Sequence, residues 1–284
     1  GETENNTEYK WFSEVTDGAT KKSESVRSEW KEKIAEEVEG VPVPKGFTYK
    51  EGTKDTGLVI KDDNGNEFVW VPATKSTYRK DTSFPGVTPT RDDTLPNGIK
   101  DETADVVKYG GFYIGRYEAG IPEGDTSPSN KIGIPVSKKD ATVWTNINYT
   151  NAKASAENMI SNEYVQTGLL TGKAWDTVCH WIKSDDELKD SRTYGNYINS
   201  LAPANENSGT KRTAGFNENW KVKNIYDLAG NVWEWTSEAC SSYFIRRGGN
   251  FRNDGSGYPV SYRSDDGASD TNDALGFRPR LYIK

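Results

Sequence analysis

The most reactive pair of side chains in the sequence is a cysteine followed directly by the only histidine of the chain. Cys179 and His180 fall in a predicted helix, where neighbouring side chains point about 100° apart, so they cannot act together as nucleophile and base. With a single histidine, the chain also offers no His-rich zinc site and no evident catalytic triad. We therefore interpret the pair as a core thiol beside a surface imidazole. Cys240, the second of two cysteines, could form a disulfide with Cys179, but two buried thiols are the simpler interpretation.

Carboxylates are the other groups that could carry chemistry, because the chain contains 43 acidic residues. Four aspartates near the C-terminus, Asp265, Asp266, Asp270 and Asp273, offer the hard oxygen ligands that calcium prefers. Their spacing does not match an EF-hand loop, so a solvated acidic loop is the alternative interpretation. A pair of carboxylates could also hydrolyse glycosidic bonds, but nothing singles out such a pair. The sequence therefore predicts no catalytic residue, no metal site and no cofactor, with calcium at these aspartates as the one open alternative.

Charge and hydropathy argue against two classes of partner. The net charge is −7, the pI is about 5.1, and no basic run occurs. This argues against nucleic acid, because binding it needs clustered positive charge. No stretch approaches the ~18 consecutive apolar residues of a membrane-spanning helix, so we expect no membrane insertion. The chain begins at Gly1 without a secretion signal, which fits either a cytosolic protein or a chain trimmed at its N-terminus.

Residues 1–40 are predicted to form a polar segment followed by an amphipathic helix over 20–39. Apolar residues recur there at every fourth position, on one helical face: Val26, Trp30, Ile34 and Val38. Gly40 is a suitable C-terminal stop, and the prolines after it prevent the helix from continuing. We expect this helix to pack, through Trp30 and Ile34, on a main domain over residues 41–284.

The main domain is predicted to combine short strands, two helices and long loops. Strands are predicted at 57–60, 67–71 and 111–118. Helices are predicted at 156–164 and 174–182. Loops are predicted at 73–108 and 184–220. A hairpin turn at Asn64–Gly65 joins the first two strands, and Thr171 is the predicted N-cap of the second helix. Strands and helices do not alternate, so the fold class is α+β and not α/β.

Five short motifs occur in order along the main domain. They are residues 68–72 (FVWVP), 112–118 (FYIGRYE), 224–236 (NIYDLAGNVWEWT), 247–251 (RGGNF) and 275–278 (LGFR). The third resembles the D-x-x-G-N-V-W-E-W signature of formylglycine-generating-enzyme (sulfatase-modifying-factor) domains, and the others resemble further motifs of that family. The resemblance covers about residues 41–284. It implies a C-type lectin fold, with a small twisted antiparallel sheet, two helices and long irregular loops.

The motif residues themselves are predicted to be scaffold. Trp233 and Trp235 alternate about Glu234, so a strand would direct both rings to one face and the carboxylate to the other. Arg247 and Arg278 flank the intervening stretch. They could hold its ends through acidic or carbonyl groups, the alternative role being contact with a substrate.

The chain departs from the catalytic members of that family where the chemistry is done. In those enzymes two cysteines follow the Gly-Gly turn, and thiolate-bound copper needs their sulfur. Residues 250–263 contain no cysteine, so we expect that the protein is not an enzyme. A formylglycine-type oxidoreductase that uses another metal is the alternative.

The composition of the same region is unusual. No Lys or Glu occurs over residues 239–283, although the chain has 24 Lys and 22 Glu, so about seven would be expected by proportion. Of the 24 residues in 250–273, 17 are Asn, Asp, Ser, Gly or Tyr. Asn codons ending in a pyrimidine yield Asp, Ser, Gly, Tyr, Phe and Arg by adenine changes alone. They cannot yield Lys, Glu, Gln, Met or Trp, none of which occurs there. An ordinary turn-rich loop is the alternative explanation.

This bias resembles adenine-directed mutagenesis of an Asn-rich template, the mark of diversity-generating-retroelement variable proteins. Those proteins use the same lectin fold and diversify the same C-terminal stretch. The resemblance implies a ligand-binding face at about residues 250–273. Thirteen residues are predicted to form it: Phe251, Arg252, Asn253, Asp254, Ser256, Tyr258, Tyr262, Ser264, Asp265, Asp266, Asp270, Asn272 and Asp273.

The expected function is therefore non-enzymatic ligand binding of a receptor-binding or adhesin-like kind. The partner would be a protein or glycan ligand on a cell surface, and the mixture of Tyr, Phe, Arg, Asp and Ser resembles that of an antibody paratope. Display would be extracellular, on a bacterial cell surface (for example on a pilin-like subunit) or on a phage or prophage particle. A carbohydrate-binding lectin of fixed specificity is a further alternative.

Overall fold

The computed structural model describes residues 30–89 and 101–284, and most of its strands belong to two sheets. The larger sheet has six strands, all paired antiparallel, in the order β3-β4-β5-β6-β14-β7. Their bounds are β3 Phe47–Glu51, β4 Val59–Asp62, β5 Glu67–Pro72, β6 Gly111–Gly115, β14 Pro279–Ile283 and β7 Val165–Leu169. The smaller sheet has the order β12-β11-β10-β13, in which only β10 and β13 pair in parallel. Their bounds are β12 Arg263–Gly267, β11 Tyr243–Arg247, β10 Trp233–Cys240 and β13 Leu275–Phe277.

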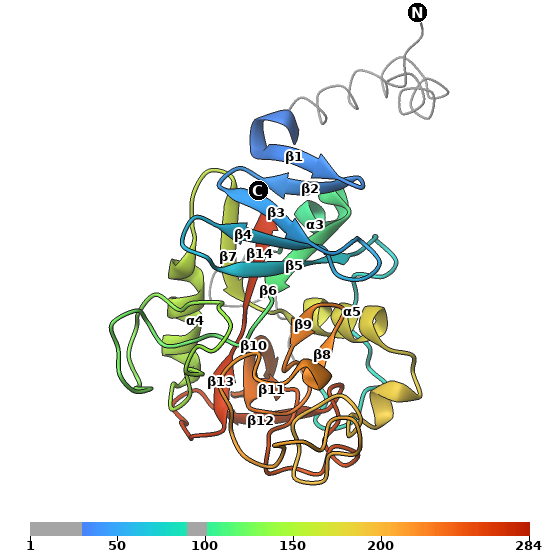
Figure 1. Ribbon diagram of the computed structural model, residues 1–284, viewed down its shortest axis with the longest axis vertical. Helices are drawn as coiled ribbons and strands as arrows, with labels where there is room; N and C mark the ends of the chain where they lie inside the picture. Colours follow the sequence, from blue (N-terminus) through green and yellow to red (C-terminus); the bar gives the residue numbers. More distant parts are fainter. Residues whose placement is uncertain (1–29, 90–100) are drawn as a thin grey trace, which may run out of the picture.

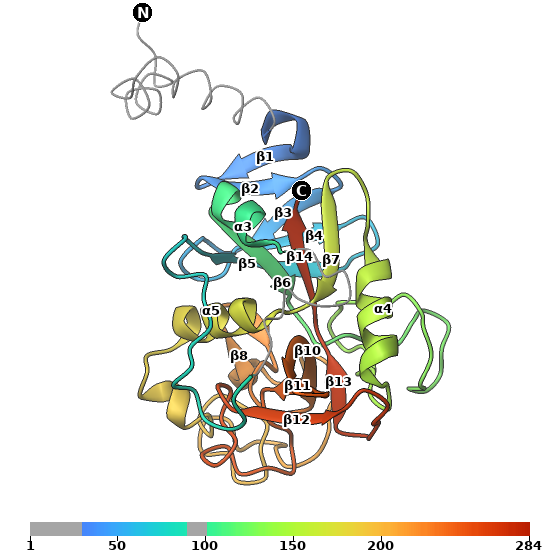
Figure 2. The same cartoon turned by 180° about the vertical axis from the view of Figure 1, so that it is seen from behind.

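The two sheets lie at opposite ends of the molecule, with the six-stranded sheet above and the four-stranded sheet below in Figure 1. A hairpin of β1 (Ile34–Val38) and β2 (Val41–Pro44) lies at the upper end, near the C-terminus. A short ribbon of β8 (Lys221–Val222) and β9 (Ile225–Tyr226) lies beside the lower sheet. The chain passes directly from β13 to β14 through the single residue Arg278, which links the two sheets (Figure 2).

Besides the helical residues 30–33, the described part of the chain has three α-helices: α3 Thr103–Tyr109, α4 Tyr149–Met159 and α5 Gly172–Ile182. Two short 3-10 helices follow, η1 Glu187–Lys189 and η2 Glu218–Trp220. Helices α4 and α5 lie on opposite sides of the molecule between the two sheets (Figures 1 and 2). The Thr171 Oγ1 accepts a hydrogen bond from Ala174 N at 3.1 Å, which confirms the predicted N-cap of α5. None of these helices is long and apolar enough to cross a membrane.

The core is built mainly from aromatic and β-branched side chains. One apolar cluster packs strands β5 and β6 against α5, and another lies within the lower sheet around Trp144, Trp233 and Trp235. The three strands predicted in the main domain correspond to β4, β5 and β6, and the first two form the predicted hairpin with Gly65 at a φ of 82°. Antiparallel sheets with a few separate helices confirm the α+β fold class.

The predicted N-terminal helix is wrong over its C-terminal part. Of residues 20–39, only 30–33 are helical in the described chain, and Ile34–Val38 form β1. Glu39 and Gly40 both have positive φ, at 53° and 77°. Two such residues make the tight turn that suits a β-hairpin, so the chain folds back and β1 pairs with β2.

The predicted packing of this segment is nevertheless confirmed. Val26 lies outside the described residues, but Trp30 stacks on Tyr109 with 5.3 Å between ring centroids. Ile34 and Val38 pack on the same apolar cluster. The described apolar positions therefore pack on the main domain as expected and are half-buried there, although Ile34 and Val38 lie in a strand.

Helix α4 begins and ends earlier than the predicted helix at 156–164. It begins after Asn148, whose side chain accepts a hydrogen bond from the first turn at 2.9 Å. It ends at Met159. There the Thr167 hydroxyl of β7 donates a hydrogen bond to the Ala156 carbonyl at 2.7 Å, in place of the backbone N–H that would continue the helix. Helix α3 lies in the stretch predicted as a loop.

Candidate ligand-binding surface

The loop that joins β11 to β12 is held at both ends by buried arginines. Arg247 ends β11 and Arg263 begins β12, and the two are directly opposite each other in the ladder. Their guanidinium groups share two acidic partners, Asp176 of α5 and Glu238 of β10. Arg247 lies 2.7 Å from Asp176 and 3.1 Å from Glu238, and Arg263 lies 2.9 Å from Glu238 and is also paired with Asp176. All four side chains are buried, so they form a closed network with balanced charge.

This network fixes the ends of the loop, because its four charged groups are closed off from water and can be solvated only by one another. Arg247 also donates to the carbonyl oxygens of Ser261 at 3.0 Å and Tyr262 at 3.2 Å. Burial raises the pKa of the Asp176 carboxyl, and the neighbouring guanidinium groups oppose that rise. A buried network of this kind specifies one arrangement, since any shift leaves a charge unpaired. The predicted role of Arg247 in holding one end of the stretch is confirmed.

Arg278 fixes the far end of the same region. Its guanidinium binds Glu234 at 2.8 Å and donates to two backbone carbonyls, including that of Gly115 at 2.9 Å. Glu234 lies on this side of β10, whereas Trp233 and Trp235 are buried in the apolar cluster of the lower sheet. The alternation predicted for the WEW motif is therefore confirmed.

Asp227, in the same motif, is a buried acid without a cationic hydrogen-bond partner. Its Oδ2 accepts a hydrogen bond from Gly215 N at 2.7 Å, while its Oδ1 has no hydrogen-bond partner among the described residues. Burial raises the pKa of Asp227 from 3.8 to about 7. The folded state thus favours the neutral acid, and the unfolded state gains from ionisation between these pKa values. Asp227 is therefore expected to lower stability as the pH rises from about 4 to 7.

An Asp227→Asn substitution should remove this pH dependence. Asparagine keeps an oxygen for Gly215 and tolerates the positive φ of 57°, but it cannot ionise. The difference in unfolding free energy between the variant and the wild type should be more favourable to the variant at pH 8 than at pH 4. The change should reach about 4 kcal/mol, because the pKa of Asp227 differs by about three units between the folded and unfolded states. Denaturant titrations at both pH values measure the difference. An equal effect of the substitution at pH 4 and pH 8 would show that Asp227 does not ionise in this range.

Twelve of the thirteen predicted binding residues are at least partly exposed. Six are exposed: Arg252, Asp254, Ser256, Tyr258, Asp270 and Asp273. Six are half-buried: Asn253, Tyr262, Ser264, Asp265, Asp266 and Asn272. Phe251 is only 7% exposed, so its predicted exposure is wrong. Its backbone N–H donates to Asn231 O at 3.1 Å, and the Arg252 guanidinium covers its ring at 4.6 Å from the centroid. Phe251 therefore lies on the scaffold side of the loop.

Two tyrosines form the aromatic centre of this surface. The rings of Tyr258 and Tyr262 are 4.9 Å apart and lie 6.1 and 6.3 Å from the Trp233 ring. Tyr258 is 40% exposed, whereas Trp233 is buried, so the group extends from solvent to the core. The Arg246 guanidinium also lies over Trp233, at 5.0 Å, and pairs with Asp266 at 2.6 Å. Tyrosine and arginine are the side chains that most often dominate binding interfaces.

Short polar side chains give the loop its shape. Asn253 Oδ1 accepts from Asn250 N at 2.9 Å, and Asn250 Oδ1 accepts from Arg252 N at 2.8 Å. Asp254 Oδ1 accepts from Ser256 N at 2.7 Å, and the hydrogen bonds from Ser256 hold the pKa of Asp254 well below its usual range. These residues form turns with their own backbone, so they serve the loop structure as well as the surface.

Arg252 is already paired within the surface. Its guanidinium makes two hydrogen bonds to Asp273, at 2.8 and 2.7 Å, and this lowers the pKa of the Asp273 carboxyl. Both side chains are about half exposed, so the pair contributes little to stability. It does connect the loop to the segment before β13 and sets the position of both side chains.

The interpretation of two buried thiols is right for Cys179 and wrong for Cys240, which is half-buried at the end of β10. Cys179 and Cys240 are both free. Cys179 is buried, and burial raises the pKa of its thiol to about 12. His180 faces Asp81 at 2.8 Å and Asp185 at 3.3 Å. The only imidazole is thus engaged with carboxylates, and Cys179 is protonated at neutral pH.

The four C-terminal aspartates do not converge on one point. Asp266 binds Arg246 and Asp273 binds Arg252, while Asp270 accepts a hydrogen bond from the backbone of β12 at 2.9 Å. Within residues 30–89 and 101–284, no three His, Cys, Asp or Glu side chains gather as a metal site would require.

Asp176 and Glu238 were not predicted as functional residues, although the sequence carries a signal for each. Asp176 interrupts the apolar face of α5, where a charge is retained only if it is paired. Glu238 follows Glu234 by four residues in one strand, so both carboxylates lie on the face opposite the tryptophans. Two buried acids need cationic partners, and Arg247 and Arg263, which follow both acids in the sequence, could have been proposed as those partners.

Comparison with known proteins supports the motif assignment. Residues 152–280 match the family model described as the sulfatase-modifying factor enzyme 1-like domain, which confirms the resemblance to this domain. That span includes β10 to β13 and the loop between β11 and β12. A comparison with curated protein sequences found no match.

Three solved structures are similar to the chain at low sequence identity. Treponema denticola variable protein 1 is 15% identical, with a TM-score of 0.45 over 82% of this chain and 98% of that one. PvdO from Pseudomonas aeruginosa is 16% identical, with a TM-score of 0.42 over 82% and 100% of the two chains. CarF is 14% identical, with a TM-score of 0.38 over 61% and 87%.

Proposed function

We propose that this chain is a non-enzymatic ligand-binding protein whose residues 250–273 are diversified by a retroelement. The proposal rests on one coincidence between composition and structure. The stretch with the codon bias forms the loop and edge strand between two buried anchors, Arg247 and Arg278. Exposed positions between fixed ends can be replaced at little cost in stability, usually about 0.5 kcal/mol or less each. Such an arrangement lets the sequence of the face change while the fold stays constant.

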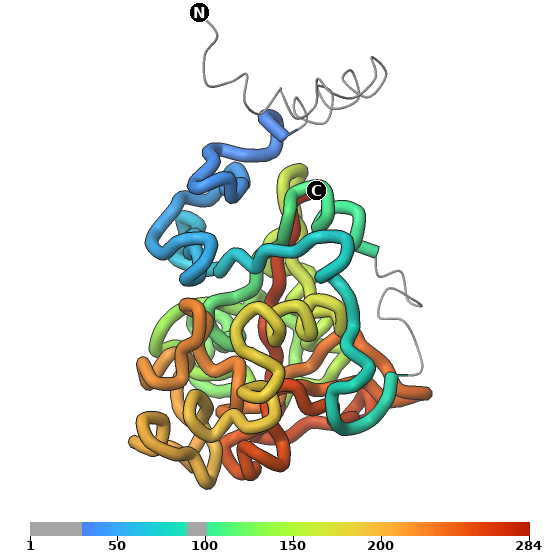
Figure 3. Tube along the Cα trace, turned by 90° about the vertical axis from the view of Figure 1, so that its right-hand side faces the viewer, coloured from blue at the N-terminus to red at the C-terminus, as the bar shows by residue number. Residues whose placement is uncertain are grey.

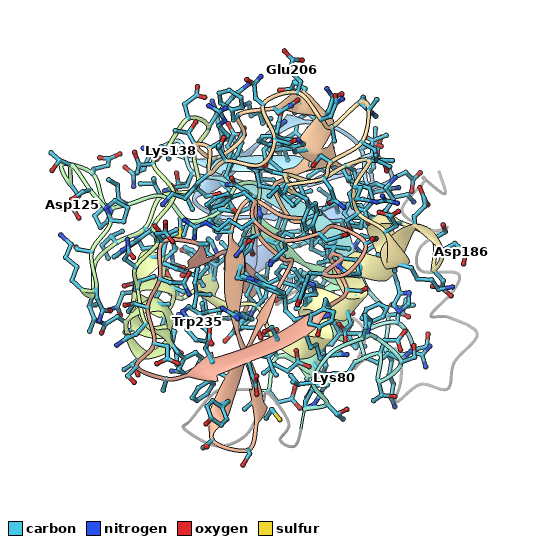
Figure 4. The ribbon with its side chains drawn as sticks, turned by 90° about the horizontal axis from the view of Figure 1, so that it is seen from below. Lys80, Asp125, Lys138, Asp186, Glu206 and Trp235 are labelled. Carbon is cyan, nitrogen blue, oxygen red and sulfur yellow. The ribbon has the colours of Figure 1, made fainter. Side chains whose placement is uncertain are left out.

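The candidate surface lies at one end of the molecule, where a large partner could reach it. The hairpin of β1 and β2 lies at one end of the molecule, and the loops at 190–210 and 248–262 lie at the other (Figures 1 and 3). Figure 4 looks onto that end, with Glu206 and Asp186 at its margin and Trp235 nearer the middle. The partner would be a protein or a glycan on a cell surface. The protein would act outside the cell, on a bacterial surface or a phage particle.

A formylglycine-type oxidoreductase is the principal rival function. It would need a pair of reactive thiols after the Gly-Gly turn, whereas Cys179 is buried in α5 with a raised pKa and Cys240, which is half-buried, precedes that turn at the end of β10. Incubation with a cysteine-containing sulfatase peptide, copper and oxygen tests this function. Conversion of the peptide cysteine to an aldehyde would overturn the proposal.

Diversification itself can be measured without knowing the ligand. In a growing population of the source organism, deep sequencing of the gene should find substitutions concentrated in codons 250–273 and at positions that are adenine in a nearby template repeat. Expected changes fall on exposed positions such as Tyr258 and Asp270 and spare the codons of Arg247 and Arg278. A reverse transcriptase gene should lie beside the template.

The long loop at 184–220 is the internal control for this experiment, because it is also rich in turns. Equal variation in both loops would mean that 250–273 is an ordinary tolerant loop. The absence of a template repeat would contradict the retroelement directly. A fixed sequence together with a defined sugar site would instead support a lectin of fixed specificity.

A further inference from the structure

A second segment, at 190–201, lies directly against the variable loop. Ile198 N donates to the carbonyl of Asn253 at 3.1 Å, and Gly255 N donates to Asn199 Oδ1 at 3.0 Å. These bonds join residues more than fifty positions apart in the chain. The two segments therefore share one ordered surface at the lower end of the molecule (Figure 1).

Two large aliphatic side chains of this segment are exposed. Ile198 is 65% exposed and Leu201 is 43% exposed. Their backbone is held in place, since Leu201 N also donates to Arg192 O at 2.8 Å. Because this segment is hydrogen-bonded to the loop at Asn253 and Gly255, a partner that covers the loop would also meet these two side chains.

The charges beside these side chains favour a cationic partner. Asp254 lies next to the segment, because its carboxylate accepts hydrogen bonds from Ser256 and Asn199, which hold its pKa well below the usual range. Arg192 is already bound by Asp190 through two nitrogens, at 2.9 and 2.6 Å. The two carboxylates therefore exceed the one guanidinium, and Asp254 is ionised without a cationic partner at hydrogen-bond distance.

We infer that Ile198 and Leu201 extend the variable face beside its residue Asp254, and that the three together bind a protein surface in which apolar side chains adjoin Lys or Arg. The inference rests on the proposed function and narrows its ligand to protein. Branched aliphatic side chains give no hydrogen bonds to sugar hydroxyls, whereas they pack against apolar side chains of a protein. A carboxylate beside them complements a cation. Ile198 and Leu201 lie outside the diversified residues, so they would supply a constant contact while the loop supplies specificity.

Three synthetic peptides of equal length serve as probes for the full chain. One alternates Leu and Lys in an amphipathic pattern, one replaces Lys with Glu, and one replaces Leu with Ser. Fluorescence anisotropy should show that the Leu–Lys peptide binds at least about tenfold more tightly than either of the others, because it alone offers both apolar and cationic groups. Equal binding of the Ser–Lys or Leu–Glu peptide, or binding of mannan at this surface in place of the Leu–Lys peptide, would overturn the inference.

Variants assign the binding to this surface. The double substitution Ile198→Ser/Leu201→Ser should lower the affinity for the Leu–Lys peptide about tenfold. Its matched control is Ile132→Ser/Ile134→Ser, on the loop beside α4, where the residues are 56% and 53% exposed and the affinity should not change. Asp254→Asn keeps an oxygen for the turn and should reduce both the affinity and its dependence on salt.

The outcomes separate this inference from the proposed function. If Arg252→Ala/Tyr258→Ala lowers the affinity for the peptide but Ile198→Ser/Leu201→Ser does not, then residues 250–273 bind the peptide and the proposed contact at Ile198 and Leu201 is wrong. If the control Ile132→Ser/Ile134→Ser lowers the affinity as much as Ile198→Ser/Leu201→Ser does, the peptide binds nonspecifically and the inference also fails. Circular dichroism of each variant confirms that the fold is intact before affinities are compared.

Discussion

Replacing Arg247 with methionine is expected to lower the free energy of unfolding by about 3–5 kcal/mol, the usual cost of removing one partner from a buried ion pair. The substitution leaves Asp176 and Glu238 with only Arg263 to neutralise them, in a region closed to water. Methionine fills much of the space of the arginine stem, so the loss is mainly electrostatic. Urea denaturation at neutral pH measures the change.

Arg246 provides the matched control, because it is the neighbouring arginine on the other face of the same strand. It pairs with Asp266, and both of these side chains are about one-fifth exposed, whereas the side chains of the Arg247 network are fully buried. Arg246→Met should therefore cost less than Arg247→Met, because it breaks one ion pair at the edge of the sheet and not two in a closed network. Equal losses for the two variants would mean that the buried network does not hold the loop.

Hydrogen exchange should distinguish loop release from global loss of stability. In Arg247→Met the amides of residues 248–262 should exchange much faster than those of β5 and β6, because the loop loses one of its anchors while the upper sheet keeps its contacts. Uniform acceleration across both sheets would contradict a local role of Arg247.

Local patterns predicted most of the scaffold. The alternation of Trp233 and Trp235 about Glu234 is a period-two pattern, and a period of two places these side chains correctly whatever the rest of the chain does. The Asn–Gly turn between β4 and β5 and the Thr171 cap are equally local. Each of these features depends on a few consecutive residues, so the sequence is sufficient to specify them.

The features that the sequence did not predict depend on contacts between distant segments. The network around Asp176 joins α5, β10, β11 and β12, and the segment with Ile198 meets the loop at Asn253. Residues Ile34–Val38 have a helical spacing of apolar positions, but pairing with β2 decides their conformation. Phe251 belongs to a stretch of biased composition and yet packs inward, because its backbone, just after the Gly-Gly turn, is hydrogen-bonded to Asn231 of the motif.

The Trp233→Ala substitution should have the largest effect on the fold and the surface together. Trp233 is buried in the lower sheet, and truncating a buried tryptophan costs about 3–5 kcal/mol, since the cavity left behind closes only in part. The same ring supports Tyr258 and Tyr262 and lies under Arg246, so the aromatic centre of the surface should lose its order as well.

Two further variants make this prediction specific. Trp233→Phe keeps a ring under the tyrosines and should recover more than half of the lost stability, whereas Trp181→Ala removes a half-buried tryptophan of α5 and should cost less than Trp233→Ala. Thermal unfolding measures the stabilities, and binding of the Leu–Lys peptide reports on the surface.

A loss below about 1 kcal/mol for Trp233→Ala would show that the WEW motif is not part of the core. If Trp233→Ala weakens the peptide at a temperature where the variant is still fully folded, then a buried residue shapes the surface through the two tyrosines. Trp233 would then set the positions of Tyr258 and Tyr262 without itself being exposed to a ligand.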